Sequence, residues 1–183
     1  GAVLTKDPAI FDKLRLLRSH GMTTMTWDRH RGHAFSYDVL EPGHNFRLDE
    51  MRAAMGLAQL DRLAGNNQRR GQAVRLYRRA MATKLPQVVV PFADRQESTF
   101  HIFPVLLPPG TDRNAVMTRL KEAGIQTSVH YPPTHLFSGY RGAGATLPVA
   151  EALAPRILTL PLFPAITPEQ ITLVVDGLAA ALG

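Results

Sequence analysis

The 183-residue sequence contains no cysteine, which excludes disulfide bonds, thiolate metal ligands and cysteine nucleophiles. It also contains no apolar run near the roughly 20 residues that a membrane-spanning helix needs. The first residues show no basic stretch followed by an apolar one, so they do not resemble a secretory signal. We therefore expect a cytoplasmic protein without a membrane-spanning segment.

The motifs of several common enzyme classes are absent as well. No loop ends in Gly-Lys-Ser or Gly-Lys-Thr, and no Gly-x-Gly-x-x-Gly stands between a predicted strand and a predicted helix. No Gly-x-Ser-x-Gly elbow occurs. The sequence therefore gives no support to P-loop hydrolysis, Rossmann-type dinucleotide binding or serine-hydrolase chemistry.

Lysine is scarce, although the protein is basic. Lys6, Lys13, Lys84 and Lys121 are the only lysines among 21 basic residues, while the net charge is +6 and the pI is about 10.2. Arginine carries most of this charge, and its planar side chain prefers two-point contacts with carboxylates and phosphates. Three interpretations stay open: nucleic-acid binding, binding of a phosphorylated small substrate, or a solvated helix face.

Hydrophobic periodicity predicts a mainly helical first half, after the end of a strand at Gly1–Thr5. Asp7 and Pro8 open a helix that Gly21 closes, because aspartate is a preferred N-cap and glycine a preferred C-cap. A buried helix is expected from Arg47 to about Leu63.

That helix is expected to be interrupted or kinked at Gly65–Asn67 and to resume over Arg69–Lys84. From about residue 85 onward the pattern predicts a small α/β domain. The expected strands cover residues 88–90, 100–107, 125–129 and 157–160. The expected helices are one capped by Thr111 that ends at Gly124, one over about 147–155, and a last one that opens with the capping box Thr167–Gln170.

The segment Gly43–Glu50 is the first candidate site. Asn45 and Arg47 stand before the predicted helix start, where free backbone amides, an amide side chain and a guanidinium suit an anionic group. Helix capping by Asn45 or Asp49 explains the same residues without any ligand.

The segment Thr127–His135 is the second candidate site, because it directly follows a predicted strand. Polar residues at the carboxyl end of a strand often line a site. His130 and Tyr131 are suited to donate hydrogen bonds or to carry protons. A rigid proline turn with a half-buried Tyr131 is the alternative.

The loop between Trp27 and Tyr37 is the third candidate, and it carries Arg29, His30, Arg31 and His33. Two histidines without carboxylate or cysteine partners are a weak metal signal, so we predict no metal site. Arg31 is kept as a candidate substrate-binding residue.

Taken in order, five groups of segments resemble the DegT/StrS type of sugar aminotransferase. They are Gly1–Thr5 with Lys13–Gly21; Gly43–Glu50 with Ala53, Ala54, Gln59 and Leu60; Phe100–Val105; Gly124–Thr127 with His130–Pro133 and His135; and Leu147–Pro148 with Glu151 and Leu158–Pro164. The resemblance covers essentially the whole chain, and the shared order of the motifs argues against chance.

The resemblance implies an α/β, fold-type-I architecture like that of aspartate aminotransferase, of which the chain is the C-terminal portion. Residues 1–47 would be the end of the large cofactor-binding domain, 48–84 linking helices, and 85–183 the small C-terminal α/β domain. The implied cofactor is pyridoxal 5'-phosphate, and the implied assembly is a homodimer. The implied reaction moves an amino group from glutamate or glutamine to a keto sugar, usually nucleotide-linked, or to a cyclitol, in polysaccharide or antibiotic sugar biosynthesis.

The same resemblance implies roles for single residues. The residue at Asn45 reaches the cofactor phosphate of the neighbouring subunit, and the pair His130–Tyr131 lies near the substrate. We add His44 and Arg47 to the candidate substrate-binding residues, although His44 replaces the usual aromatic residue. The cofactor lysine, the acid that pairs with the cofactor ring and the ring-stacking residue all precede the matched segments. We therefore expect no catalytic residue in this chain and no activity from it alone.

Two alternatives remain. Some related proteins are sugar dehydratases that have histidine in place of the cofactor lysine, and that position also precedes the matched segments. The other alternative is a non-catalytic module that binds a partner or nucleic acid through the arginine-rich helix at 69–84. We favour the aminotransferase, whose partners are a sugar substrate and an amino-acid donor rather than nucleic acid or a membrane.

Overall fold

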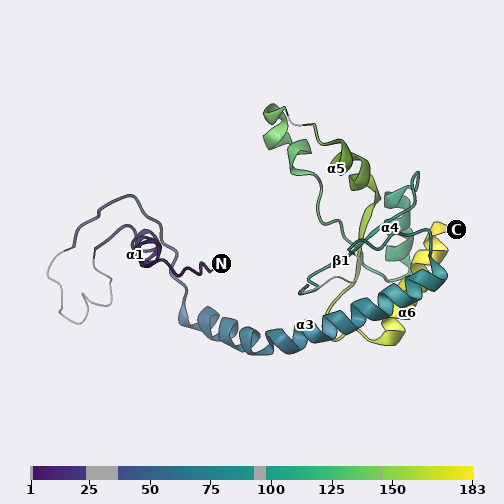
Figure 1. Cartoon of the computed structure of the whole chain (residues 1–183), viewed down its shortest axis with the longest axis horizontal. Helices are drawn as coiled ribbons and strands as arrows, with labels where there is room; N and C mark the ends of the chain where they lie inside the picture. Colours follow the sequence, from purple (N-terminus) through teal and green to yellow (C-terminus); the bar gives the residue numbers. More distant parts are fainter. Residues whose placement is uncertain (1, 24–36, 93–97, 145) are drawn as a thin grey trace. The chain divides into compact units, whose positions relative to one another are not determined.

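The computed structural model describes residues 2–23, 37–92, 98–144 and 146–183. The chain forms two compact units, Gly1–Leu60 and Asp61–Gly183, and the border between them falls within the long helix α3 (Glu50–Lys84). Figure 1 shows both units and labels the helices α1, α3, α4, α5 and α6 and the strand β1. None of the helices in these four ranges combines the length and the apolar character needed to cross a membrane.

Helix α1 (Pro8–Leu17) in the first unit begins as the sequence predicts, because the Asp7 carboxylate accepts hydrogen bonds from two amides of the first turn. The helix ends earlier than predicted, with Arg18 rather than Gly21 as its C-cap. Gly21 still closes the turn: it has a φ of 70°, and its N–H donates to the Leu16 carbonyl at 3.0 Å.

Gly21 and Gly43 allow two backbone segments to touch. A Cβ atom on Gly21 would overlap the carbonyl oxygen of Glu41, and one on Gly43 would overlap the nitrogen of Gly21. The chain that returns toward α3 is therefore fixed against the end of α1 by direct backbone contact. The strand predicted at Gly1–Thr5 is not formed in the described part, Ala2–Thr5, since a strand needs a hydrogen-bonded neighbour and no described residue provides one.

Helix α3 runs without a break from Glu50 to Lys84, so the interruption predicted at Gly65–Asn67 is wrong. A glycine inside a helix costs about 1 kcal/mol relative to alanine, which is too little to end a long helix. The Asn67 side chain accepts a hydrogen bond from Arg70 within the helix. Packing of the second half, where Tyr77 and Met81 are buried, outweighs the weak local propensity.

The second unit contains a two-stranded antiparallel sheet, β1 (Phe103–Leu106) and β2 (Ile157–Leu160). Strand β2 has the predicted bounds, whereas β1 is shorter than the predicted 100–107. The strands predicted at 88–90 and 125–129 are reduced to single bridges, from Val89 to Leu106 and from Ser128 to Thr159.

Local chain geometry explains both reductions. Pro86 and Pro91 flank the segment 88–90, and proline has no N–H to donate to a ladder. The N–H of Ile125 donates to the Leu120 carbonyl at 2.8 Å, so the start of the other segment is still tied to the end of a helix.

The described residues of the unit also form the helices α4 (Arg113–Glu122), α5 (Pro148–Leu153) and α6 (Pro168–Leu182). The predicted capping box of α6 is confirmed, since both reciprocal hydrogen bonds between Thr167 and Gln170 are present. The cap predicted at Thr111 is wrong, because the carboxylate of Asp112 accepts the first-turn amides of α4 instead. Short 3-10 turns cover Thr134–Leu136, Ser138–Ala143 and Ala154–Arg156.

The core of the second unit combines the sheet with α4, α6 and the second half of α3, which lie around β1 in Figure 1. Tyr77, Leu120 and Leu178 are fully buried there, one from each helix. The Tyr77 ring stacks on Phe103 with 4.7 Å between centroids, and its hydroxyl donates to the Pro161 carbonyl at 2.8 Å. These contacts connect α3 to the loop that follows β2.

Candidate functional site

The candidate cofactor residue Asn45 lies in the extended segment that returns along the end of α1. Asn45 forms a bridge with Ser19, and the residues on either side of it donate their N–H groups to the carbonyls of Leu17 and Arg18 at 2.7 and 2.9 Å. Carbonyls at a helix end need such partners. The backbone at Asn45 is therefore fixed, while the residue itself is exposed.

The helix start expected next to Asn45 lies further along the chain. Helix α3 begins at Glu50, and the Asp49 carboxylate caps it by accepting the N–H of Arg52 at 2.9 Å. The sequence left Asn45 and Asp49 as possible capping residues, and Asp49 is the one that caps α3. The argument that helix amides assist anion binding therefore does not apply to Asn45.

The other first-unit candidates are also exposed. The His44 ring stacks on Phe46 with 4.9 Å between centroids, and Arg47 follows directly. Arg31 and the rest of the third candidate segment between residues 27 and 36 lie outside the described residues. In the parts of the chain that the structure describes, no group of three or more His, Asp or Glu residues could hold a metal ion.

The second candidate segment lies beside β2. Ser128 and Thr159 exchange two backbone hydrogen bonds at 3.1 and 2.8 Å. The peptide bond between His130 and Tyr131 is cis, and their rings meet edge to face with 4.8 Å between centroids. Tyr131 is 67% exposed, so the half-buried tyrosine of the alternative interpretation is not found.

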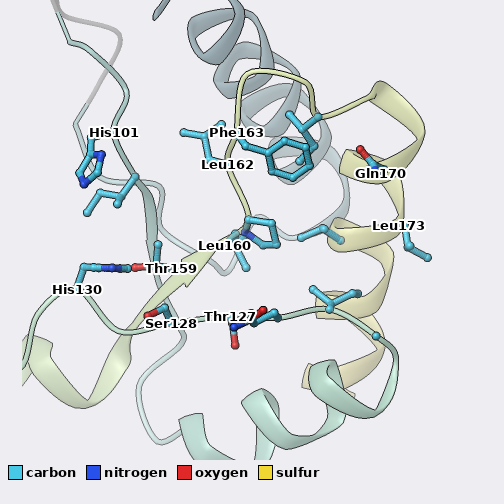
Figure 2. Close-up of a pocket in the computed structure, with 17 residues that line it drawn as sticks. His101, Thr127, Ser128, His130, Thr159, Leu160, Leu162, Phe163, Gln170 and Leu173 are labelled. Atoms are coloured by element: carbon cyan, nitrogen blue, oxygen red, sulfur yellow. The ribbon is translucent and has the colours of Figure 1, made fainter. Parts of the chain in front are cut away.

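A pocket of about 540 Å³ in the second unit is lined by His130. Its walls come from the segment 124–130, from β2 and the loop after it, and from the first turns of α6. Figure 2 shows His101, Ser128, His130 and Thr159 on one side of the pocket, with Phe163, Gln170 and Leu173 on the other. The site is thus polar at one side and largely apolar elsewhere.

Two atoms at the polar side are buried and, among the described residues, lack a hydrogen-bond partner: His130 Nδ1 and Thr159 Oγ1. Thr159 is 6% exposed. Sequence reasoning missed it because a threonine in a strand is ordinary. Its place between the buried residues Leu158 and Leu160 was a usable signal, since one polar residue in a buried strand calls for a partner.

His135 has a different environment from His130. Its Nε2 lies 2.9 Å from Glu151 Oε1, and its side chain is 9% exposed. Glu151 also accepts the Leu147 N–H at 2.9 Å. The hydrogen bond from Leu147, followed by that from His135, holds the pKa of the Glu151 carboxyl below its usual value. This pair connects the turn after His130–Tyr131 to helix α5.

The structure therefore brings His130 and Tyr131 together with Thr159 in the second unit, whereas His44, Asn45 and Arg47 belong to the first unit.

Solved structures of aminotransferases share this fold. PseC from Helicobacter pylori, an aminotransferase involved in the biosynthesis of pseudoaminic acid, matches with a TM-score of 0.85 and 27% identity, over 97% of this chain and 47% of its own. The putative sugar aminotransferase Spr1654 from Streptococcus pneumoniae, in its PMP form, matches with a TM-score of 0.83 and 25% identity, over 99% and 47%. The sugar aminotransferase CalS13 from Micromonospora echinospora matches with a TM-score of 0.79 and 31% identity, over 95% and 45%.

The class of protein that this α/β fold defines is the fold-type-I sugar aminotransferase, as the sequence resemblance predicts. A sequence model of the DegT/DnrJ/EryC1/StrS aminotransferase family matches residues 1–179, and the chain belongs to that family. The family is pyridoxal-phosphate-dependent, and Spr1654 is known in PMP and PLP forms. The predicted family, fold class and cofactor are thereby confirmed. The chain spans about half the length of the solved structures that it matches.

Proposed function

We propose that the natural protein containing these 183 residues transfers an amino group from glutamate or glutamine to a keto group. The acceptor that we favour is a nucleotide-linked sugar, and the alternative acceptor is a cyclitol. The family match over residues 1–179 carries this proposal. We also propose a cytoplasmic location and keep the three predicted regions, 1–47 from the large domain, 48–84 as the linker and 85–183 as the small domain.

The surroundings of Asn45 suit the phosphate group of the cofactor. Its exposed amide is a donor that does not titrate, and its backbone is already fixed against α1, so little freedom is lost on binding. When bound, pyridoxal phosphate supplies the electron sink that amino transfer requires. In the proposal, Asn45 of one subunit binds the phosphate group in the site of the neighbouring subunit.

In the proposal, none of the four lysines of this chain binds the cofactor covalently. Lys13 pairs with Glu41, and Lys84 pairs with Asp176. We expect that pyridoxal phosphate and borohydride leave Lys6, Lys13, Lys84 and Lys121 without stoichiometric label in this chain, as mass spectrometry can measure. Amino transfer by the chain alone, together with a stoichiometric label on one of the four, would contradict this.

The candidate substrate-binding residues have unequal support. They are His130, Tyr131, His44, Arg47 and Arg31. His130 lines the pocket and Tyr131 packs on its ring, so these two side chains can hold or orient a sugar. His44 and Arg47 are exposed, which leaves them accessible to an anionic part of the substrate.

The homodimer is supported by apolar side chains that the first unit leaves uncovered. Phe46, Leu48, Met51, Met55, Leu57 and Leu60 are each between 63% and 79% exposed. Apolar surface of this extent is typical of interaction sites. In the proposal it is covered by a second subunit, which also brings Asn45 to its site.

Two arginines of α3 donate hydrogen bonds to backbone carbonyls of the second unit, and others are exposed. Arg70 Nε donates to the Thr99 carbonyl at 3.2 Å, and Arg78 donates to the Pro91 carbonyl at 3.0 Å. These contacts hold the two side chains against the chain itself. Arg69, Arg75 and Arg79 are exposed, as a solvated helix face predicts.

The test follows nitrogen-15 from labelled glutamate or glutamine into nucleotide-linked keto sugars in the presence of the natural protein and pyridoxal phosphate. The expected result is a labelled amino sugar, identified by mass spectrometry. Loss of water from the sugar without incorporation of nitrogen would instead favour the related dehydratases. No change in any sugar would contradict the proposal.

The subunit assignment has its own test. In the natural protein, Asn45→Ala and a replacement of the cofactor lysine are made separately and then mixed. Because each defect would fall in a different composite site, mixed dimers are expected to recover up to one working site. Mixed dimers that form and recover nothing would show that both residues act in the same site.

A further inference from the structure

We propose that the pair His135–Glu151 positions the ring of His130, which lines the pocket, and the ring of Tyr131 beside it. Neither member of the pair touches a substrate in this proposal, so both are positioning residues. Their part in the reaction rests on the proposed function, whereas the positioning itself can be tested without turnover.

Tyr131 needs a support outside the core. It is 67% exposed, so packing does not fix its orientation, and its ring meets the ring of His130 edge to face. The chain before these two residues is fixed, because Ser128 exchanges two backbone hydrogen bonds with Thr159. The two rings keep one orientation only if the chain after Tyr131 has a second fixed point.

Two consecutive prolines connect Tyr131 to the turn that carries His135. The proline ring fixes φ near −65°, and a residue before a proline is confined to extended conformations. Pro133 has a φ of −60° and a ψ of 123°, and its carbonyl accepts the N–H of Leu136 at 3.0 Å, which closes the turn. The position of His135 therefore constrains the position of Tyr131 four residues earlier.

Glu151 fixes His135. The Nε2 atom of His135 lies 2.9 Å from Glu151 Oε1, and the histidine side chain is 9% exposed. The same oxygen accepts the Leu147 N–H at 2.9 Å, while the Glu151 N–H donates to the Leu147 carbonyl at 2.9 Å. The carboxylate is thus held at the start of α5, and a hydrogen bond to a group that is already held costs little entropy.

Helix α5 is itself anchored to the second unit. The residues that follow it are held by Arg113 at the start of α4, which donates to the carbonyls of Ala154 and Ile157 at 2.5 and 3.3 Å. The pair His135–Glu151 therefore joins the chain after Tyr131 to a fixed part of the unit.

The first test follows the ring protons of His130 by NMR in the natural protein, in His135→Ala and Glu151→Ala, and in the double variant. Tyr131→Leu provides the reference, because it removes the ring-current shift that the tyrosine produces. Each single variant should move the His130 signal most of the way to this reference. The double variant should move it no further, since both changes break the same contact. Unchanged His130 signals in both single variants would overturn the proposal.

Conservative variants separate the contact from general effects. Glu151→Gln keeps an acceptor oxygen and should retain most of the His130 shift. Glu169→Gln, at the start of α6, is the control and should retain all of it. A Glu169→Gln signal that moves as far as that of Glu151→Ala would overturn the proposal.

The second test measures amino transfer. His135→Ala should lower kcat/KM for the keto sugar roughly tenfold to a hundredfold, because the rings beside the pocket are misplaced. Its affinity for pyridoxal phosphate, measured by equilibrium dialysis, should not change. An active protein with unchanged kcat/KM, or one that loses cofactor affinity to the same extent, would overturn the proposal. A natural protein without amino transfer, whose His130 signals respond as expected, would refute only the proposed function.

Discussion

The hydroxyl of Tyr77 links the buried core to the wall of the pocket. Tyr77 is fully buried and donates to the carbonyl of Pro161, which lines the pocket. Burial disfavours the charged phenolate and therefore raises the pKa of Tyr77 above its usual value. A single side chain thus contributes to stability and to the position of the loop after β2.

For Tyr77→Phe we expect a loss of about 1–3 kcal/mol in unfolding free energy at neutral pH, because the Pro161 carbonyl loses its partner. A raised pKa in the folded state means that the contribution of Tyr77 is complete below its unfolded pKa of about 10 and is lost as the pH rises above it. Urea unfolding between neutral and strongly alkaline pH should therefore show the two proteins converging. A difference that does not change with pH would contradict this.

For Asn45→Ala in the natural protein we expect cofactor affinity to fall roughly tenfold to a hundredfold, the loss of one hydrogen bond to a charged group. Equilibrium dialysis of pyridoxal phosphate measures this. Asn45→Asp is the matched variant, since it keeps the shape but repels phosphate, and it should bind more weakly still. Unchanged affinity in both variants would remove Asn45 from the cofactor site.

At the level of elements, the pair His135–Glu151 holds the turns that follow His130–Tyr131 against α5. The Glu151 carboxylate accepts from both Leu147 and His135, and these bonds lower its pKa. A carboxyl with a lowered pKa in the folded state stabilises the fold above its unfolded pKa. That contribution is lost as the pH falls through the folded pKa.

We therefore expect protection of the Leu147 amide from hydrogen exchange to fall at acidic pH in the natural sequence. Glu151→Gln should show weaker protection that depends little on pH, because glutamine can still accept hydrogen bonds but does not titrate. Glu169→Gln is the control, since Glu169 also has a lowered pKa but lies at the start of α6. An identical response of Leu147 to both substitutions would contradict a local role for Glu151.

At the level of the whole molecule, the exposed apolar residues at the start of α3 predict self-association of the isolated chain. Met51 and Met55 are 79% and 69% exposed and lie one turn apart on the same face. Replacing both with glutamate should raise the monomeric fraction in analytical ultracentrifugation, whereas Val149→Glu, at another exposed position, should not. A chain that stays monomeric at all concentrations would contradict the prediction.

The sequence by itself determined the features that depend on neighbouring residues. Asp7 caps α1, the Thr167–Gln170 box opens α6, and Ile157–Leu160 forms β2, because capping chemistry and periodicity act within a few residues. The order of the motifs was also sufficient to place the chain in its family, which the match over residues 1–179 confirms.

Only the tertiary structure decided the features that depend on distant residues. Helix α3 continues through Gly65 because its second half is buried, and Ser128 pairs with a single residue because Ile125 is tied to α4. Thr159 belongs to the pocket because β2 lies beside Ser128, a contact between positions far apart in the chain. Which buried atoms remain unpaired follows from packing in three dimensions, and no local pattern encodes it.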